Sequence, residues 1–188
     1  VEASIEEAEH RGMHAWAYDE NGWPSGFGSG RVNGLGLEYQ QKYLRMEETP
    51  EHTEHRICKS GDHYFYFEVN PFYVDTLDAK VIKEFIESTY VPYYEKFGNR
   101  IEGFFTDEPQ YYRWGTVWSD KMPAEFEAAY GYNVLDYLPA LFIDFDGDKE
   151  FRYDYWKLCH KLFINHWIKP VYDWCEENGC RLTGHAVE

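Results

Sequence analysis

The segment Phe104-Phe105-Thr106-Asp107-Glu108-Pro109 constrains the fold of this chain more than any other. The apolar run that starts at Ile101 is short and stops at turn formers, which is typical of a strand buried on both faces. Pro109 has no N–H for a central ladder and disfavours helical geometry at the residue before it. We therefore expect Asp107 and Glu108 at the carboxyl end of a strand, where α/β enzymes keep catalytic side chains. The alternative is an acidic turn that caps the next helix.

Three other segments repeat this pattern of an apolar strand followed by polar residues. They are Gly12–Tyr18 before Asp19-Glu20, His63–Val69 before Asn70-Pro71, and Arg181–Ala186 before Glu188. Helical patterns accompany them at Val1–Arg11, Asp75–Phe97 and Lys149–Asn178, with kinks expected at Pro92 and Pro170. Strands that alternate with amphipathic helices indicate parallel βα units. The sequence thus predicts an α/β fold in which parallel βα units form part of a TIM (β/α)₈ barrel.

Length sets a limit on this barrel. A complete (β/α)₈ barrel takes about 250 residues, whereas this chain has 188. We expect residues 1–188 to be a segment of a single (β/α)-barrel catalytic domain, incomplete and weakly active or inactive in isolation. Its open sheet edges would bind the missing remainder of the barrel or a second copy of the chain.

Composition excludes some functions. The net charge of −16, from 34 acidic and 18 basic residues, opposes binding to nucleic acid. No apolar run is long enough to span a membrane. The four cysteines lack zinc-site spacing, and free thiols favour a cytoplasmic over a secreted or periplasmic location, although a Cys175–Cys180 bridge stays open. Aromatic residues make up 20% of the chain, and those in loops, such as Trp114, either stack on sugars or pack on neighbouring loops.

The glycine-rich stretch 22–36 follows the first strand without the Gly-Lys-Ser/Thr of a phosphate-binding loop. Its glycines are suited to a loop that folds tightly over a strand end, with Trp23 and Pro24 as a rigid wall. The polar segment 46–60, with His52 and His55, is expected to be a solvated loop. His185 differs, because it lies at a strand end; a ligand-binding histidine and a structural one are both consistent with that position.

Two of these motifs carry a family resemblance. Tyr18-Asp19-Glu20-Asn21-Gly22-Trp23-Pro24-Ser25-Gly26 and Phe104–Pro109 resemble signatures of bacterial glycoside hydrolases related to family 106, the α-L-rhamnosidases. Segments 118–142 and Thr183-Gly184-His185 with Glu188 are similar to later parts of the same catalytic domain. The resemblance implies a (β/α)₈ catalytic domain that acts on an L-rhamnose-like sugar with inversion. It is also compatible with a bound calcium ion, but no cofactor is firmly implied.

Glycoside hydrolysis requires a carboxylic acid that protonates the leaving oxygen and a carboxylate that activates water or attacks the sugar. We assign Glu108 as the general acid and Glu188 as the second carboxylate, with Asp107 as the other candidate for the acid. The sugar would be bound by a set of polar and aromatic side chains from the strand ends: Tyr18, Asp19, Glu20, Trp23, Asn70 and His185.

Two rival functions remain at this stage. A non-catalytic carbohydrate-binding module would need the aromatic residues but no converging carboxylates. A metal-dependent hydrolase would use a mixed set of carboxylates and histidine as ligands, which suits divalent metals. That set would comprise Asp19, Asp107, His185 and Glu188.

Overall fold

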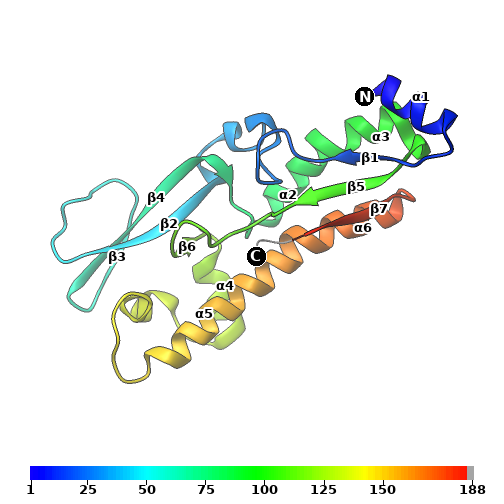
Figure 1. The fold of residues 1–188 in the computed structure, drawn as a ribbon. Coiled ribbons are helices and arrows are strands. Elements are labelled where there is room, and N and C mark those ends of the chain that lie inside the picture. Colours follow the sequence, from blue (N-terminus) through cyan, green and yellow to red (C-terminus); the bar gives the residue numbers. More distant parts are fainter. Residues whose placement is uncertain (186–188) are drawn as a thin grey trace.

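The computed structural model describes residues 1–185 and has a mixed α/β fold with two sheets (Figure 1). The strands are β1 (Ala15–Tyr18), β2 (Gln40–Glu47), β3 (Arg56–Ser60), β4 (His63–Val74), β5 (Ile101–Asp107), β6 (Val117–Trp118) and β7 (Arg181–His185). The α-helices are α1 (Glu2–His10), α2 (Ala79–Phe85), α3 (Val91–Phe97), α4 (Met122–Tyr130), α5 (Asp148–Phe163) and α6 (Lys169–Glu177). Short 3₁₀ and π segments are η1 (Gly28–Gly30), η2 (Asn33–Leu35), η3 (Leu37–Tyr39), η4 (Ile86–Tyr90), η5 (Gly98–Arg100), η6 (Val134–Leu141) and η7 (Ile164–Ile168).

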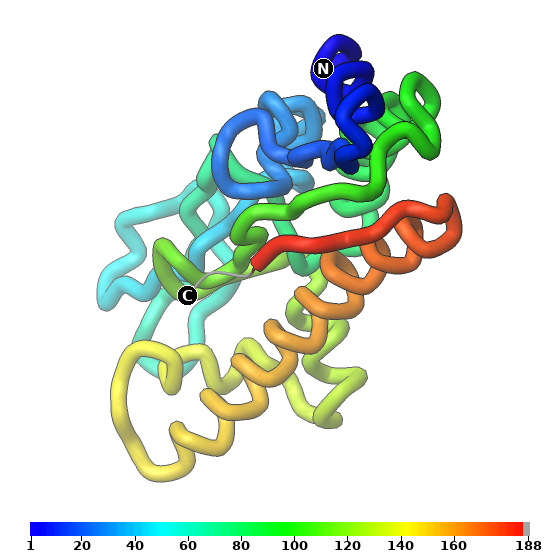
Figure 2. The backbone as a smooth tube through the Cα atoms, turned by 45° about the vertical axis from the view of Figure 1, so that its right-hand side comes forward, coloured from blue at the N-terminus to red at the C-terminus, as the bar shows by residue number. Residues whose placement is uncertain are grey.

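The first sheet is parallel and has the strand order β1-β5-β7. Three of the four strands expected from the sequence are therefore confirmed as parallel neighbours. The helices that precede β5 and β7 cover one face of this sheet (Figures 1 and 2). On that face Phe104 stacks on Tyr90 at 4.3 Å between ring centroids and meets the edge of Trp174 at 5.9 Å. Contacts between such large apolar rings stabilise the packing of the sheet on its helices.

Both long helical stretches contain a π-helical segment just before a proline. Segment η4 joins α2 to α3 and ends two residues before Pro92, and η7 joins α5 to α6 and ends two residues before Pro170. Proline has no N–H to donate to the preceding turn, and its ring clashes with the carbonyl four residues earlier. Widening the turn lets the helix pass the proline, so the expected kinks take the form of π segments.

The second sheet is antiparallel, with the order β3-β4-β2-β6. The prediction of His63–Val69 as a parallel barrel strand is therefore wrong. This segment belongs to β4, which continues past Pro71 and pairs with β2 and β3. Pro71 lies where the β2–β4 register shifts, next to the pair Gln41–Asn70, and such an irregularity in the ladder is a place where a strand can contain a proline. Part of the polar segment expected to be a loop forms β3.

In residues 1–185 the parallel strands form an open sheet of three strands and not a closed barrel. The TIM barrel predicted from the sequence is thus not seen in this part of the chain; the confirmed statement is the coarser one, a mixed α/β fold. All four cysteines are free thiols, which settles the open question of a Cys175–Cys180 bridge. In the described residues no helix combines the length and apolar character that crossing a bilayer requires.

Candidate functional site

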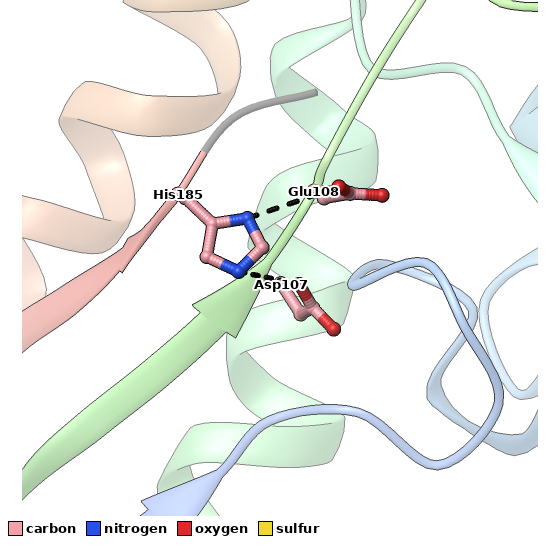
Figure 3. Close-up of side chains that lie close together, drawn as sticks. All are labelled: Asp107, Glu108 and His185. Atoms are coloured by element: carbon pink, nitrogen blue, oxygen red, sulfur yellow. Dashed lines mark ion pairs between the residues drawn. The ribbon is translucent and has the colours of Figure 1, made fainter. Parts of the chain in front are cut away.

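The face of the parallel sheet opposite the helices leaves the rings of Trp16 and Tyr18 exposed. The carboxyl edge of this open face carries the candidate site, whose side chains Figure 3 shows. Strand register pairs Tyr18 with Phe105 and Asp107 with His185. Because side chains alternate between the two faces of a strand, all four project to the open face. The rings of Tyr18 and Phe105 stack at 5.2 Å, and His185 meets the edge of Phe105 at 5.7 Å. The sheet register alone therefore brings these residues together.

Asp107 is the most strongly held of these side chains. The hydroxyl of Tyr18 donates to its Oδ2 atom, and Nε2 of His185 lies 3.2 Å from its Oδ1 atom. The hydrogen bond to Asp107 raises the pKa of Tyr18 above its usual range, and burial of the hydroxyl adds to this. Tyr18 therefore remains a proton donor at neutral pH. Both oxygens of Asp107 have a fixed partner.

Glu108 joins the same edge by a departure from strand geometry. Its φ of 49° is left-handed, a region that few non-glycine residues occupy. Its N–H donates to the carbonyl of His185 at 2.9 Å, which keeps the chain attached to β7 beyond the end of β5. The carboxylate lies 3.9 Å from Nδ1 of His185 and 3.5 Å from Nη1 of Arg113. Compared with Asp107, it is loosely held and faces the open side.

Asp19 lies on the other side of the sheet and is only 3% exposed. Its carboxylate accepts hydrogen bonds from the hydroxyls of Ser25 and Tyr90. Burial raises the pKa of Asp19, although these two hydrogen bonds act in the opposite direction. The structure therefore places Asp19 among buried partners and away from the open face where the sequence led us to expect it.

Ser25 ties the loop after β1 to the end of β5. Its N–H donates to the carbonyl of Asp107 at 2.9 Å, and its Oγ accepts from the N–H of Asp107 at 2.6 Å. The same Oγ donates to Asp19. The glycine-rich loop therefore folds back onto a strand end, as the sequence predicts. This loop requires Gly26, whose φ is 116° and whose added Cβ would lie 2.9 Å from the ring of Trp167.

Gly184 has a comparable role one residue before His185. A Cβ at this position would lie 1.9 Å from the carbonyl oxygen of Thr106. Only glycine allows β7 to approach β5 this closely and so to bring His185 to the carboxylates.

The remaining predicted residues lie at different distances from this cluster. Glu20 is half-buried near Tyr18, and one of its carboxylate oxygens has no hydrogen-bond partner. Burial raises the pKa of Glu20, and the nearby charge of Asp107 adds a smaller increase. Asn70 lies in β4 of the other sheet, where its amide donates to Gln41 at 3.0 Å. Trp23 carries the guanidinium of Arg113 over its ring at 4.6 Å. Glu188 lies outside the described residues.

A cavity of about 650 Å³ borders this cluster without including its carboxylates. It lies between β7 and the helical stretch of α5 and η7, and its lining is mostly apolar. His185 is part of that lining, but Asp107 and Glu108 are not. Hydrolytic chemistry needs contact with ionisable groups, so we place the candidate site on the open sheet face and not in this cavity.

One oxygen or nitrogen atom from each of Asp107, Glu108 and His185 lies within 4.8 Å of the others, close enough to bind one metal ion. The mixture of two carboxylates and an imidazole suits a transition metal such as zinc or manganese. It does not suit calcium, which takes six to eight oxygen ligands. The calcium ion that the family resemblance allows therefore does not fit these three side chains.

Sequence reasoning assigned no role to Ser25, Tyr90 or Arg113. Ser25 lies in the Trp-Pro-Ser-Gly motif described above, but its hydrogen bonds to Asp19 and Asp107 were not predicted. Arg113 follows Glu108 by five residues, and a lone cation between Tyr112 and Trp114 in an acidic chain is a signal that could have been used. Tyr90 gave no signal, because it lies in an ordinary amphipathic helix pattern.

Comparisons with known proteins support the fold and go no further. No family model matches the sequence, and no curated protein matches it. Among solved structures, a rhamnosidase from Novosphingobium sp. PP1Y is similar, with a TM-score of 0.50 and 23% identity over 71% of this chain. The chain spans 13% of the length of that rhamnosidase. Residues of this protein thus form a domain that resembles part of a rhamnosidase.

Proposed function

We propose that this chain contributes the general-acid side of the active site of a glycoside hydrolase that acts on a rhamnose-like or related glycan. The observation that carries the proposal is the convergence of Asp107, Glu108 and His185 at the carboxyl ends of parallel strands. The similarity in fold to part of a rhamnosidase supports the same class of reaction. Many unrelated functions share one fold, so the cluster of side chains supports the assignment more directly than the fold does.

Glu108 is the better candidate for the acid. The general acid must turn a protonated oxygen towards the leaving group, and its side chain must be free to do so. Glu108 has only distant partners, at 3.5 Å and 3.9 Å. Asp107 has both oxygens engaged by Tyr18 and His185. We assign Asp107 to orienting His185 and Tyr18, whose exposed sides bind sugar hydroxyls, and Glu188 to the second carboxylate.

The test is Glu108→Gln in the full-length protein, assayed on two α-L-rhamnosides. A methyl glycoside has a poor leaving group and needs the acid, so its kcat should fall about 10²- to 10⁴-fold. A p-nitrophenyl glycoside needs little protonation and should lose far less. Glu188→Gln should slow both substrates alike, because attack on the sugar is lost.

Glu176→Gln is the control, since Glu176 is an exposed carboxylate of α6 and has no contact with the cluster. Its kcat on both substrates should stay within about tenfold of wild type. Equal rates for wild type and Glu108→Gln on the methyl glycoside would reject Glu108 as the acid.

A metal-dependent hydrolase is the second candidate, and the metal-like spacing of Asp107, Glu108 and His185 favours it. The bound ion would supply an activated water molecule. Asp19, part of the ligand set expected from the sequence, is buried and bonded elsewhere. Elemental analysis of the purified protein decides between the two: one equivalent of zinc or manganese, lost in His185→Ala together with activity, would favour the metal.

A further inference from the structure

A second hollow lies beside the candidate site and has aromatic walls. It measures about 420 Å³, which falls within the range of about 300–1,000 Å³ for small-molecule sites. The hollow is lined by side chains from the antiparallel sheet and two loops: Trp23, Pro24, Tyr43, Asn70, Phe72, Tyr73 and Trp114. Three of its rings are well exposed, with Trp23 at 42%, Phe72 at 75% and Trp114 at 55%. Exposed large rings gathered at one concave place mark a binding surface.

Arg113 connects this hollow to Glu108. Its guanidinium lies 4.6 Å from the ring centre of Trp23 and 5.3 Å from that of Trp114. The same group reaches to 3.5 Å from the carboxylate of Glu108. A single side chain therefore spans the distance from the aromatic walls to the candidate acid. A sugar ring bound in the hollow would therefore be next to the glycosidic bond that Glu108 protonates.

The hollow also has fixed polar atoms. The side-chain oxygen of Asn70 accepts from the N–H of Phe72 at 3.1 Å, and its amide donates to Gln41 at 3.0 Å. These bonds fix the orientation of the amide. Arg113, with its side chain 38% exposed, has further N–H donors. Apolar ring faces with a few oriented donors and acceptors match a sugar, which has apolar C–H faces and hydroxyl edges.

The charge of the molecule narrows the class of ligand. Nucleobases also stack on aromatic rings, but their phosphates would be repelled by a chain of net charge −16. Two cations lie against the walls of the hollow, Arg113 on Trp23 and Arg45 on Tyr43. Glu108 and Glu68 already balance their charges. The site therefore suits a neutral ring better than an anionic one.

We propose that this aromatic hollow is a second sugar subsite, which binds the ring on the leaving-group side of the bond cleaved at Glu108. The proposal rests on the proposed function and narrows its substrate class. The substrate is an oligosaccharide or a longer glycan, in which a neutral sugar follows the rhamnose-like ring, and not a glycoside of a small alcohol.

The experiment compares Trp114→Ala with wild type in the full-length protein, on methyl α-L-rhamnoside and on an α-L-rhamnosyl-D-glucose disaccharide. The kcat/KM for the disaccharide should fall about tenfold, mainly through KM, because a ring stack is lost. The methyl glycoside, which does not reach the hollow, should change less than twofold. Trp114→Phe should recover most of the loss. Tyr153→Ala removes an exposed ring of α5, far from the hollow in sequence, and should change neither substrate.

Calorimetric titration of the disaccharide into wild type and Trp114→Ala separates this proposal from the proposed function. Weaker binding to Trp114→Ala supports the subsite even where neither protein hydrolyses the disaccharide, and then only the hydrolase assignment fails. Equal losses on both substrates, or disaccharide binding that is unchanged by Trp114→Ala, would overturn the subsite and leave the assignment of Glu108 standing. A wild-type protein that does not bind the disaccharide would overturn it as well.

Discussion

Strands β1 and β5 of the parallel sheet run into the same dipeptide, Asp-Glu, yet the two pairs have different surroundings. Asp19 is buried and accepts from two hydroxyls. Asp107 projects to the open face, beside Glu108 and His185. Similar sequence patterns thus give one carboxylate that stabilises the fold and another that can meet a ligand.

The difference comes from strand register. Tyr18 is paired with Phe105, so Asp19 corresponds to Thr106, and Glu20 corresponds to Asp107. A shift of one residue in a strand exchanges the two faces. Asp19 therefore falls on the helix-covered side and Asp107 on the open side. The left-handed φ of Glu108 then breaks the alternation and lets a second carboxylate reach the same edge.

The largest effect that this comparison predicts is on stability. Asp19→Ala leaves the hydroxyls of Ser25 and Tyr90 buried without an acceptor, and should lower the free energy of unfolding by about 3 kcal/mol. Asp107→Ala, whose partners can turn to water, should cost less than about 1 kcal/mol. Urea unfolding followed by circular dichroism measures both. Equal losses for the two variants would contradict the division into a structural and a ligand-facing acid.

A smaller effect should appear in the pH dependence of stability. An aspartate in the unfolded chain ionises at about 3.9, whereas burial raises the pKa of Asp19 in the folded state. The folded state therefore binds more protons above pH 3.9, so the free energy of unfolding falls as the pH rises towards the native pKa and stays lower beyond it. Asp19→Asn removes this contribution and should gain stability relative to wild type as the pH rises from about 4 to 7.

Asp107→Asn provides the control for this titration, because its partners lie on the open face. Asp75, whose burial raises its pKa to about 6, contributes equally to wild type and both variants. Urea unfolding at several pH values gives the difference between each variant and wild type. A slope of that difference that is the same for the two variants would show that Asp19 does not titrate as a buried acid.

The smallest effect should follow Tyr18→Phe, which removes one hydroxyl and leaves the ring stack with Phe105 in place. Asp107 loses the donor that fixes its Oδ2 atom, so we expect kcat on a rhamnoside to fall about tenfold, with little change in stability. Tyr172→Phe, at an exposed position of α6, is the control. Unchanged kcat in Tyr18→Phe would mean that Tyr18 does not orient the cluster.

Sequence reasoning located the parallel strands because short apolar runs that end in turn formers are a local signal. It missed β2, which contains Lys42, a fully buried lysine paired with Asp120 at 3.3 Å. A lysine in the sequence indicates a solvent-exposed side chain, because the partner that stabilises its charge in the interior is distant in the chain. It also placed β4 in the wrong sheet, since an aromatic run does not reveal whether its neighbours are parallel or antiparallel.

The same limit applies to the candidate site. Asp107, Glu108 and His185 could be predicted, because strand ends in a parallel sheet meet at one edge. Whether an acid beside a strand end faces a ligand depends on register, which the sequence of a single strand does not contain. The hydrogen bond between Ser25 and the N–H of Asp107 joins residues 82 positions apart, and no local sequence pattern predicts it.

Carbodiimide labelling of carboxyl groups, read by mass spectrometry with and without saturating L-rhamnose, tests the central claim most directly. The account predicts that Glu108 is labelled in the free protein and protected by the sugar, and that Asp19 is unlabelled in both samples. Labelling of Asp19 that rhamnose suppresses, with Glu108 unaffected, would reverse the roles of the two acid pairs and contradict the account.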